Sequence, residues 1–162
     1  MQNNISKILK KQMHNCYPKI FLCIGSSKCI GDSLGPKVGE ILSKKINNIY
    51  VFGNMEQNVS YSNINIVLEE IYHKINNPYL IIIDSALSDK QYVGNIIINR
   101  NSMIIGSALN KQDYELGNIS IKGIVGERQN SSINNFNILN GVSKDLIEKL
   151  AYNISNQILQ SL

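Results

Sequence analysis

The chain has 162 residues, of which 43% are hydrophobic and 17% charged, a composition typical of one folded domain with a single core. The formal net charge is only +4 and the lysines are scattered, which argues against a nucleic-acid partner. No apolar run reaches the roughly 18 residues that span a membrane, and the first residues lack the apolar core of a secretory signal. Three cysteines without a CxxC pair are typical of reduced thiols. We therefore expect a cytoplasmic protein with no membrane partner.

The amino-terminal half alternates amphipathic and wholly apolar segments. Residues 3–14 predict a short helix, within an extension (1–17) that precedes a core at about 19–160. The pattern then predicts strands at 19–25, 49–53 and 79–83, and helices at about 34–46 and from Ser60 to about residue 75. The third strand is apolar on both faces, as a central parallel strand is, and we expect it to end at Asp84.

The carboxyl-terminal half contains shorter segments. It predicts strands at 93–98 and 102–105 around a turn at 99–101, a strand at 119–125, an asparagine-rich loop at 126–141 and a final helix at about 142–160. A βαβαβ order followed by short strands and a helix favours an α/β fold. We expect one domain over residues 1–162, built as a three-layer αβα sandwich with a mostly parallel central sheet.

A glycine-punctuated loop from Gly25 to Pro36 follows the first strand and contains one carboxylate, Asp32. In doubly wound sheets the first and third strands are often neighbours, and ligand crevices open at that point. Asp32 and Asp84 would then face one crevice, where they could share a proton, divide acid and base roles, or bind a divalent ion. Asp32 lies near a helix start, which favours its ionised form. Asp84 follows three isoleucines, and desolvation would favour its protonated form.

Other interpretations of these residues stay open. Asp32 could be only a helix cap and Asp84 only a polar strand end. The glycine loop lacks the Lys-Ser/Thr of a phosphate-binding P-loop and the spacing of a dinucleotide fingerprint, although an anion could bind at the start of the helix that follows.

The remaining reactive residues give weaker signals. Cys29 has no evident base, because His73 belongs to a helix flank and His14 to the amino-terminal segment. Zinc-ligand spacing is absent from the sequence. Glu127 and Arg128 follow a predicted strand and could enter the same crevice, but a surface salt bridge is the role we expect for them.

Two stretches at 22–25 and 30–39 resemble the signature of the sporulation protein YyaC family, with Gly-Asp-Ser-Leu-Gly-Pro (31–36) the most specific part. The resemblance continues at 51–53, 81–86, 93–94 and 117–125, and so covers about residues 20–125. That family is similar in fold to hydrogenase maturation proteases and to the germination protease of endospore formers. It thus implies a phosphorylase/hydrolase-like fold and a sporulation-associated peptidase in the mother cell or forespore.

The resemblance also implies a site. In the related peptidases the site consists of the acidic residue of the first loop and the Asp that ends the third core strand. These residues recognise a metal in the hydrogenase maturation proteases and form a catalytic pair in the germination protease. The motif carries these roles to Asp32 and Asp84, which activate water against a protein or peptide substrate and could hold a divalent metal. The expected substrate-binding residues are Gly25, Gly31, Ser33 and Ser85.

The chain departs from the family pattern in two places. Where the pattern has Pro-Val-His-Ala ahead of an asparagine, residues 58–61 read Asn-Val-Ser-Tyr, with Asn63 retained, so a histidine ligand is missing. The segment after Val125 also differs. It has Gly126 followed by Glu-Arg-Gln-Asn (127–130), whereas the family pattern contains more glycine there. These departures support a second hypothesis, in which the chain is a catalytically inactive binding or regulatory protein that keeps the crevice for an anion or peptide.

Overall fold

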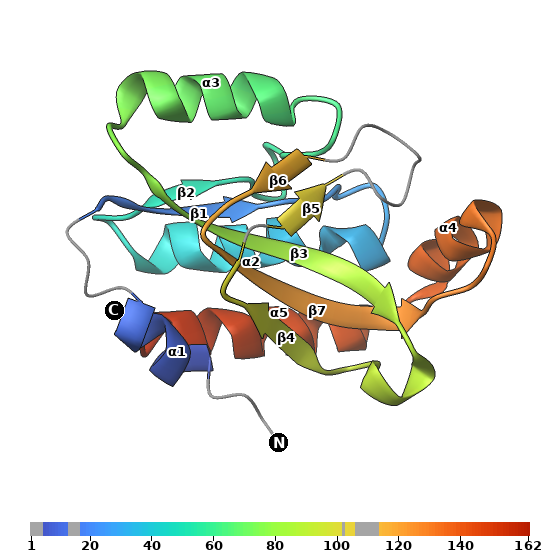
Figure 1. Cartoon of the computed structure of the whole chain (residues 1–162). Coiled ribbons are helices and arrows are strands. Elements are labelled where there is room, and N and C mark those ends of the chain that lie inside the picture. The colour runs from blue at the N-terminus through green and yellow to red at the C-terminus, as the bar shows by residue number, and fades with distance from the viewer. Residues whose placement is uncertain (1–4, 13–16, 102, 106–113) are drawn as a thin grey trace.

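A five-stranded sheet separates two layers of helices in the computed structural model (Figure 1). The structure describes residues 5–12, 17–101, 103–105 and 114–162; His14 and Ser102 lie outside the described residues. The strand order is β2-β1-β3-β7-β4, parallel except for β4, which pairs antiparallel with β7. The strands of this sheet are β1 (Lys19–Cys23), β2 (Tyr50–Phe52), β3 (Tyr79–Ser88), β4 (Ile96–Asn99) and β7 (Ile119–Glu127).

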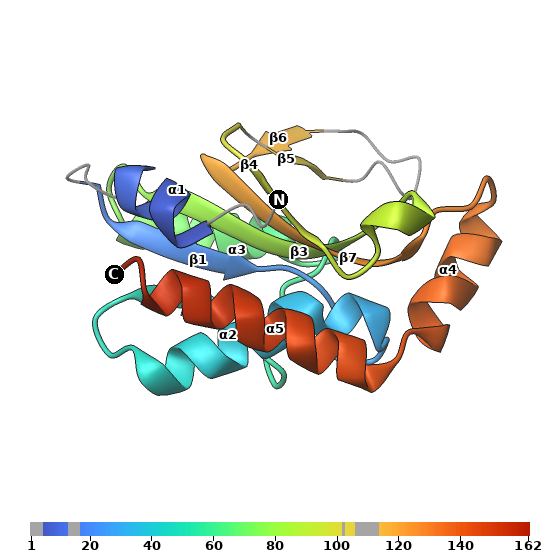
Figure 2. The ribbon, with the colours of Figure 1, turned by 90° about the horizontal axis from the view of Figure 1, so that it is seen from below.

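Helices cover both faces of the sheet. α3 (Ile64–Lys74) lies on one face, and α1 (Ile5–Gln12), α2 (Leu34–Lys45) and α5 (Lys144–Leu159) lie on the other (Figures 1 and 2). The 3-10 turns are η1 (Gly31–Ser33) and η2 (Lys90–Tyr92), and α4 (Ser132–Gly141) follows β7. The expected three-layer αβα sandwich with a mostly parallel sheet is confirmed. Within the described ranges, no helix has the length and apolar character to cross a bilayer.

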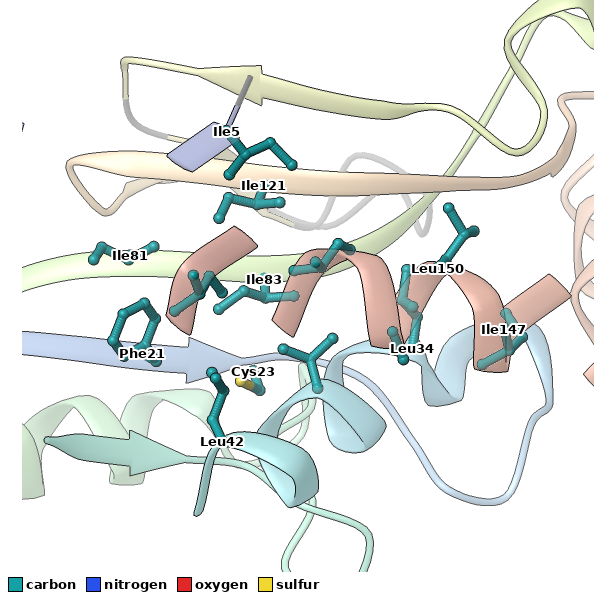
Figure 3. Packing of buried hydrophobic residues seen from close by; sticks show 14 of the residues in the cluster. Ile5, Phe21, Cys23, Leu34, Leu42, Ile81, Ile83, Ile121, Ile147 and Leu150 are labelled. Carbon is teal, nitrogen blue, oxygen red and sulfur yellow. The ribbon is translucent and has the colours of Figure 1, made fainter. Parts of the chain in front are cut away.

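The two helical layers explain why β1 and β3 are apolar at nearly every position. Successive side chains of a strand point to opposite faces, so each strand contributes to two cores. One core packs against α1, α2 and α5 and includes Phe21, Cys23, Ile81 and Ile83 (Figure 3). The other packs against α3 and includes Ile20, Leu22, Leu80 and Ile82. Ile5 and Leu9 of α1 are fully buried in the first core, so this amino-terminal helix packs on the domain.

One expectation for the carboxyl-terminal half is wrong. Residues 126–141 are not a continuous loop, because α4 occupies 132–141, with the Ser131 hydroxyl accepting a hydrogen bond from the Asn134 N–H as its cap. No side chain of α4 is buried, so the sequence carries no apolar periodicity there. The two strands expected on either side of residues 99–101 are present, as β4, which pairs with β7, and β5 (Met103–Ile105), which pairs with β6 (Tyr114–Leu116).

The third strand is also longer than expected. β3 continues through Asp84 to Ser88, because β7 runs beside it and pairs with it as far as Glu127. Asp84 therefore lies inside a paired strand rather than at its end. This position fixes its backbone within the sheet.

Candidate active site

The loop after β1 folds back on itself and carries Asp32 to the carboxyl end of the sheet. Gly25 has φ +143°, and a Cβ atom there would lie 2.0 Å from the Asp32 carbonyl oxygen, so only glycine fits. The Ser26 N–H donates to the same carbonyl at 3.0 Å and closes the loop. η1, which contains Asp32, contacts β3. The loop thus holds Asp32 beside the strand that carries Asp84.

Asp84 stands on the face of the sheet that α3 covers. Leu80 and Ile82 pack in the α3 core, and Asp84 continues their alternation along β3. The first and third strands are direct neighbours, as expected, with Cys23 of β1 paired with Ile83. Asp32 and Asp84 are both partly buried.

The two carboxyl groups have different proton affinities. Burial and then the negative charge of Asp32 raise the pKa of Asp84 from 3.8 to about 8, against smaller opposing effects of the Ser85 N–H and Lys122. Burial raises the pKa of Asp32 from 3.8 to about 6, although a backbone hydrogen bond from Ser26 lowers it. The direction expected for Asp84 is confirmed, whereas at Asp32 burial outweighs the expected effect of the helix start. Near neutral pH, Asp84 keeps its proton and Asp32 is ionised.

A lysine that is not among the expected site residues lies next to Asp84. Lys122 of β7 is the register partner of Asp84 in the parallel β3–β7 pair, so both side chains stand on the same face. On its other side Lys122 pairs with Ile97 of β4, which offers it no polar group. The signal in the sequence is weak, since Lys122 follows Ser120 at the polar positions of the alternating stretch 119–122 and so fits an ordinary strand with one polar face.

The four residues expected to bind substrate lie around the two aspartates, but several of their polar groups are engaged. The Ser33 hydroxyl is buried and donates to the Ile30 carbonyl at 2.7 Å. The Ser85 N–H donates to Asp84 Oδ1 at 2.7 Å. Gly31 packs against α4, where a Cβ atom would lie 2.7 Å from the Leu139 carbonyl oxygen. These groups shape the site, and their role toward a substrate stays a prediction.

The backbone N–H groups of the glycine loop are largely committed to bonds within the protein. The Gly25 N–H donates to the Val59 carbonyl at 2.8 Å. The Ser27 N–H donates to the Asn58 side chain, also at 2.8 Å. Hydrogen bonds within the protein occupy the N–H groups of Gly25, Ser26, Ser27, Lys28, Cys29 and Ser33. These six donors are not free to bind a substrate oxygen or an anion.

Asparagine side chains hold the loop at residues 58–63, in which Ser60 stands where the family pattern has a histidine. Asn63 Oδ1 accepts the Ser60 N–H at 2.8 Å, and Asn63 Nδ2 donates to the Asn58 carbonyl at 2.9 Å. Both ends of the Asn63 amide are therefore used to fix this loop. The Ser60 hydroxyl, at the position of the missing histidine, bonds to the Ser62 hydroxyl at 2.8 Å.

Glu127 and Arg128, at the end of β7, do not form the expected salt bridge with each other. The Arg128 guanidinium donates to the Leu87 carbonyl at 3.2 and 3.3 Å rather than to a carboxylate, and Glu127 is exposed. Among the ion pairs of the described residues, none joins Glu127 to Arg128. The expected surface salt bridge is wrong, and Arg128 instead ties the end of β7 to β3.

A separate cleft of about 760 Å³ lies at the opposite end of β1 and β2. Its walls include Tyr17, Lys19 and Tyr50. Lys19 and Tyr50 begin their strands, whereas Asp32 follows the carboxyl end of β1, so the cleft is not part of the aspartate site.

A family model described as "Protein of unknown function (DUF1256)" matches residues 1–157. The chain belongs to the DUF1256 family. It is also 30% identical over 126 residues to "Uncharacterized protein YyaC" of Bacillus subtilis strain 168, a match that covers 77% of this chain and 60% of that protein. The expected membership of the YyaC family is thereby confirmed, and the chain spans about 60% of the length of this relative.

The fold of this chain is similar to that of hydrogenase maturation proteases. The chain superposes on the [NiFe] hydrogenase maturation protease HycI of Thermococcus kodakarensis with a TM-score of 0.63 and 16% identity, over 96% of this chain and 98% of that one. HybD of the same organism gives a TM-score of 0.53 at 15% identity, covering 88% and 97% of the two chains. HybD of E. coli gives 0.52 at 14% identity, covering 90% and 91%. At these identities the likeness concerns the fold.

The metal that the resemblance implies does not match the donors in this DUF1256 chain. No group of three or more His, Cys, Asp or Glu side chains is placed to hold an ion among the residues that the structure describes. A catalytic zinc site takes about three protein ligands. Here the charges of Asp32 and Lys122 both act on Asp84, and the positive charge of Lys122 disfavours binding of a metal cation beside it. The described residues therefore do not fit a zinc ion held by three protein ligands.

Proposed function

We propose that this chain is a peptidase in which Asp32 and Asp84 activate water for hydrolysis of a peptide bond. The observation that carries the proposal is the contact of η1, the turn that carries Asp32, with β3, the strand that carries Asp84. Burial raises the pKa of Asp32 to about 6 and that of Asp84 to about 8, which favours an ionised Asp32 and a protonated Asp84. A pair of carboxyl groups whose environments separate their pKa values can act as base and acid at one site. The likeness in fold to hydrogenase maturation proteases supports the same class of reaction.

The reaction follows from these states. The Asp32 carboxylate takes a proton from water as the water oxygen bonds to the amide carbon. The carbonyl oxygen gains the negative charge that leaves Asp32, and the Asp84 O–H donates a hydrogen bond to it. When the carbonyl re-forms, the C–N bond breaks and the proton on Asp32 passes to the leaving nitrogen. Atoms and charge balance, and the pair returns to its starting state after product release.

An exposed apolar face beside the site supports a protein or peptide as the substrate. Ile133 and Phe136 of α4 lie one helical turn apart and are 71% and 62% exposed. α4 contacts η1, the turn that carries Asp32. A peptide chain that reaches Asp32 could therefore lay apolar side chains on α4.

The test is cleavage of a mixture of internally quenched peptides by the unmodified chain, Asp32→Asn and Asp84→Asn. Each variant should lose activity by at least about 100-fold, the usual contribution of a general acid or base. Asp89→Asn, at an exposed carboxyl group, is the matched control and should retain activity. Full activity in either Asp32→Asn or Asp84→Asn would refute the mechanism.

A second function is favoured by one observation, the commitment of six loop N–H groups to internal bonds. If the substrate oxygen needs these committed N–H groups, the chain would instead be a binding or regulatory protein for a peptide. Thermal shifts with peptides, phosphate and Mg²⁺ distinguish the two proposals. Stabilisation by peptide without cleavage favours the binding protein, and cleavage excludes it.

We propose sporulation as the setting, from the resemblance to the YyaC family alone. A fluorescent fusion followed through sporulation should then concentrate in the mother cell or the forespore. A fusion that is absent from sporulating cells would contradict this.

A further inference from the structure

The reaction proposed above needs a group that stabilises negative charge on the substrate oxygen. Such donors commonly come from backbone N–H groups, and removing one lowers kcat by about 100- to 1,000-fold. Six of the loop N–H groups beside Asp32 already bond within the protein. The Asp84 O–H is one donor, but a neutral acid supplies no positive charge.

We propose that Lys122 supplies this charge, as a cation that contacts the substrate carbonyl oxygen during peptide hydrolysis. This inference rests on the proposed function and extends it to a third catalytic residue. Its basis is the strand register, which sets the Lys122 side chain directly beside Asp84 on the same face of the sheet. On the other side stands Ile97, so the polar neighbour of the ammonium group along the sheet is the carboxyl of Asp84.

The place of Lys122 beside Asp84 gives it a chemical role. Asp84 of β3 and Lys122 of β7 are direct neighbours across the sheet, and η1, the turn that carries Asp32, contacts β3. During water attack the negative charge moves from Asp32 to the oxygen that Asp84 binds. Lys122 stands beside Asp84, so its ammonium group lies next to the oxygen on which the charge develops and stabilises that charge as it forms. An interaction of this kind accelerates the reaction because it is stronger in the transition state than in the ground state.

The charge balance of the site is consistent with a lysine beside the two carboxyl groups. Two carboxyl groups that hold one proton carry one negative charge, which Lys122 neutralises. Among the described residues, Asp32 and Lys122 are the groups whose charges act on Asp84. A lysine is a compact point charge on a flexible stem and can take the electrostatic role of an ion at close range.

The experiment compares peptide cleavage by the unmodified chain, Lys122→Met, Lys122→Arg and the control Lys149→Met. Methionine keeps most of the length of the side chain without its charge, and Lys149 is exposed on α5. Lys122→Met should lower kcat by about 100-fold, whereas Lys122→Arg should retain most of the activity. Removal of the cation also raises the pKa of Asp84, so the alkaline limb of the Lys122→Met pH profile should move to higher pH. A purely structural role would not move that limb.

The outcomes separate this inference from the function on which it rests. An unmodified chain that cleaves no peptide overturns both proposals. Cleavage by the unmodified chain, with Lys122→Met equally active and with an unchanged pH profile, overturns only the role of Lys122. Equal loss in Lys122→Met and Lys122→Arg, with both variants folded by circular dichroism and no shift of the alkaline limb, would also overturn it.

Discussion

Replacement of Asp84 by asparagine should change how the stability of the fold depends on pH. The pKa of Asp84 is raised from 3.8 to about 8, so the folded chain binds this proton more tightly than the unfolded chain does. The stabilisation is therefore complete below about pH 4 and is lost as the pH rises toward 8. Asparagine has a similar shape and no proton to lose, so the variant should lack this dependence.

The size of the effect follows from the same values. A tenfold change in proton affinity is worth about 1.4 kcal/mol, and the change from 3.8 to about 8 spans about four such factors. Water reaches part of the side chain and screens the interaction, so we expect about 2–3 kcal/mol rather than the full value. The unmodified chain should lose that much more free energy of unfolding than Asp84→Asn between about pH 5 and pH 8.5.

Urea unfolding followed by circular dichroism at both pH values gives these free energies, provided that the transitions are two-state. Asp89→Asn, at an exposed carboxyl, is the control and should follow the unmodified chain. Parallel pH dependences for the unmodified chain and Asp84→Asn would refute the claim that Asp84 is protonated in the folded state near neutral pH.

Three further predictions concern the loop, the substrate and the reaction. Gly35→Ala puts a Cβ atom 2.0 Å from the Ile24 carbonyl oxygen. Urea unfolding should therefore show that the free energy of unfolding falls by about 1–3 kcal/mol. The control Gly141→Ala, whose Cβ atom has nothing within 4 Å, should not destabilise the fold. Phe136→Ser should raise KM for peptide cleavage with little change in kcat. The control is Tyr152→Ser, since Tyr152 on α5 is as exposed as Phe136, and it should change neither constant. An unchanged KM in Phe136→Ser would exclude α4 from substrate binding. The pH profile of cleavage should be bell-shaped, with limbs near pH 6 and pH 8, and a flat profile over this range would contradict the assignment of base and acid.

The parts of the fold that the sequence predicts well are those with strong local signals. β1 and β3 are apolar on both faces because helices cover both, and such short, wholly apolar runs are typical of central parallel strands. Doubly wound sheets usually place the first and third strands side by side, which predicts the observed pairing of β1 with β3. Asp32 and Asp84 can therefore be proposed together from the sequence alone.

The parts that the sequence does not predict depend on contacts between distant segments. The end of β3 cannot be located from residues 79–88 alone, because β7 supplies its last partners. α4 buries no side chain and so leaves no periodic pattern. The role of Lys122 depends on the register of β3 against β7, and a shift of one residue would turn its side chain to the other face. In the sequence Lys122 is one polar position of an alternating strand, and nothing there identifies Asp84 as its neighbour.

The central claim is that one proton is shared unequally by two neighbouring carboxyl groups. Carbon-13 NMR of the aspartate carboxyls, titrated from about pH 3 to pH 10, measures this directly in the unmodified chain and in Asp32→Asn. We expect Asp84 to titrate near pH 8 and Asp32 near pH 6, and we expect the pKa of Asp84 to fall in Asp32→Asn because the neighbouring negative charge is gone. Titration of both groups near pH 4, or an Asp84 pKa that Asp32→Asn leaves unchanged, would contradict the account.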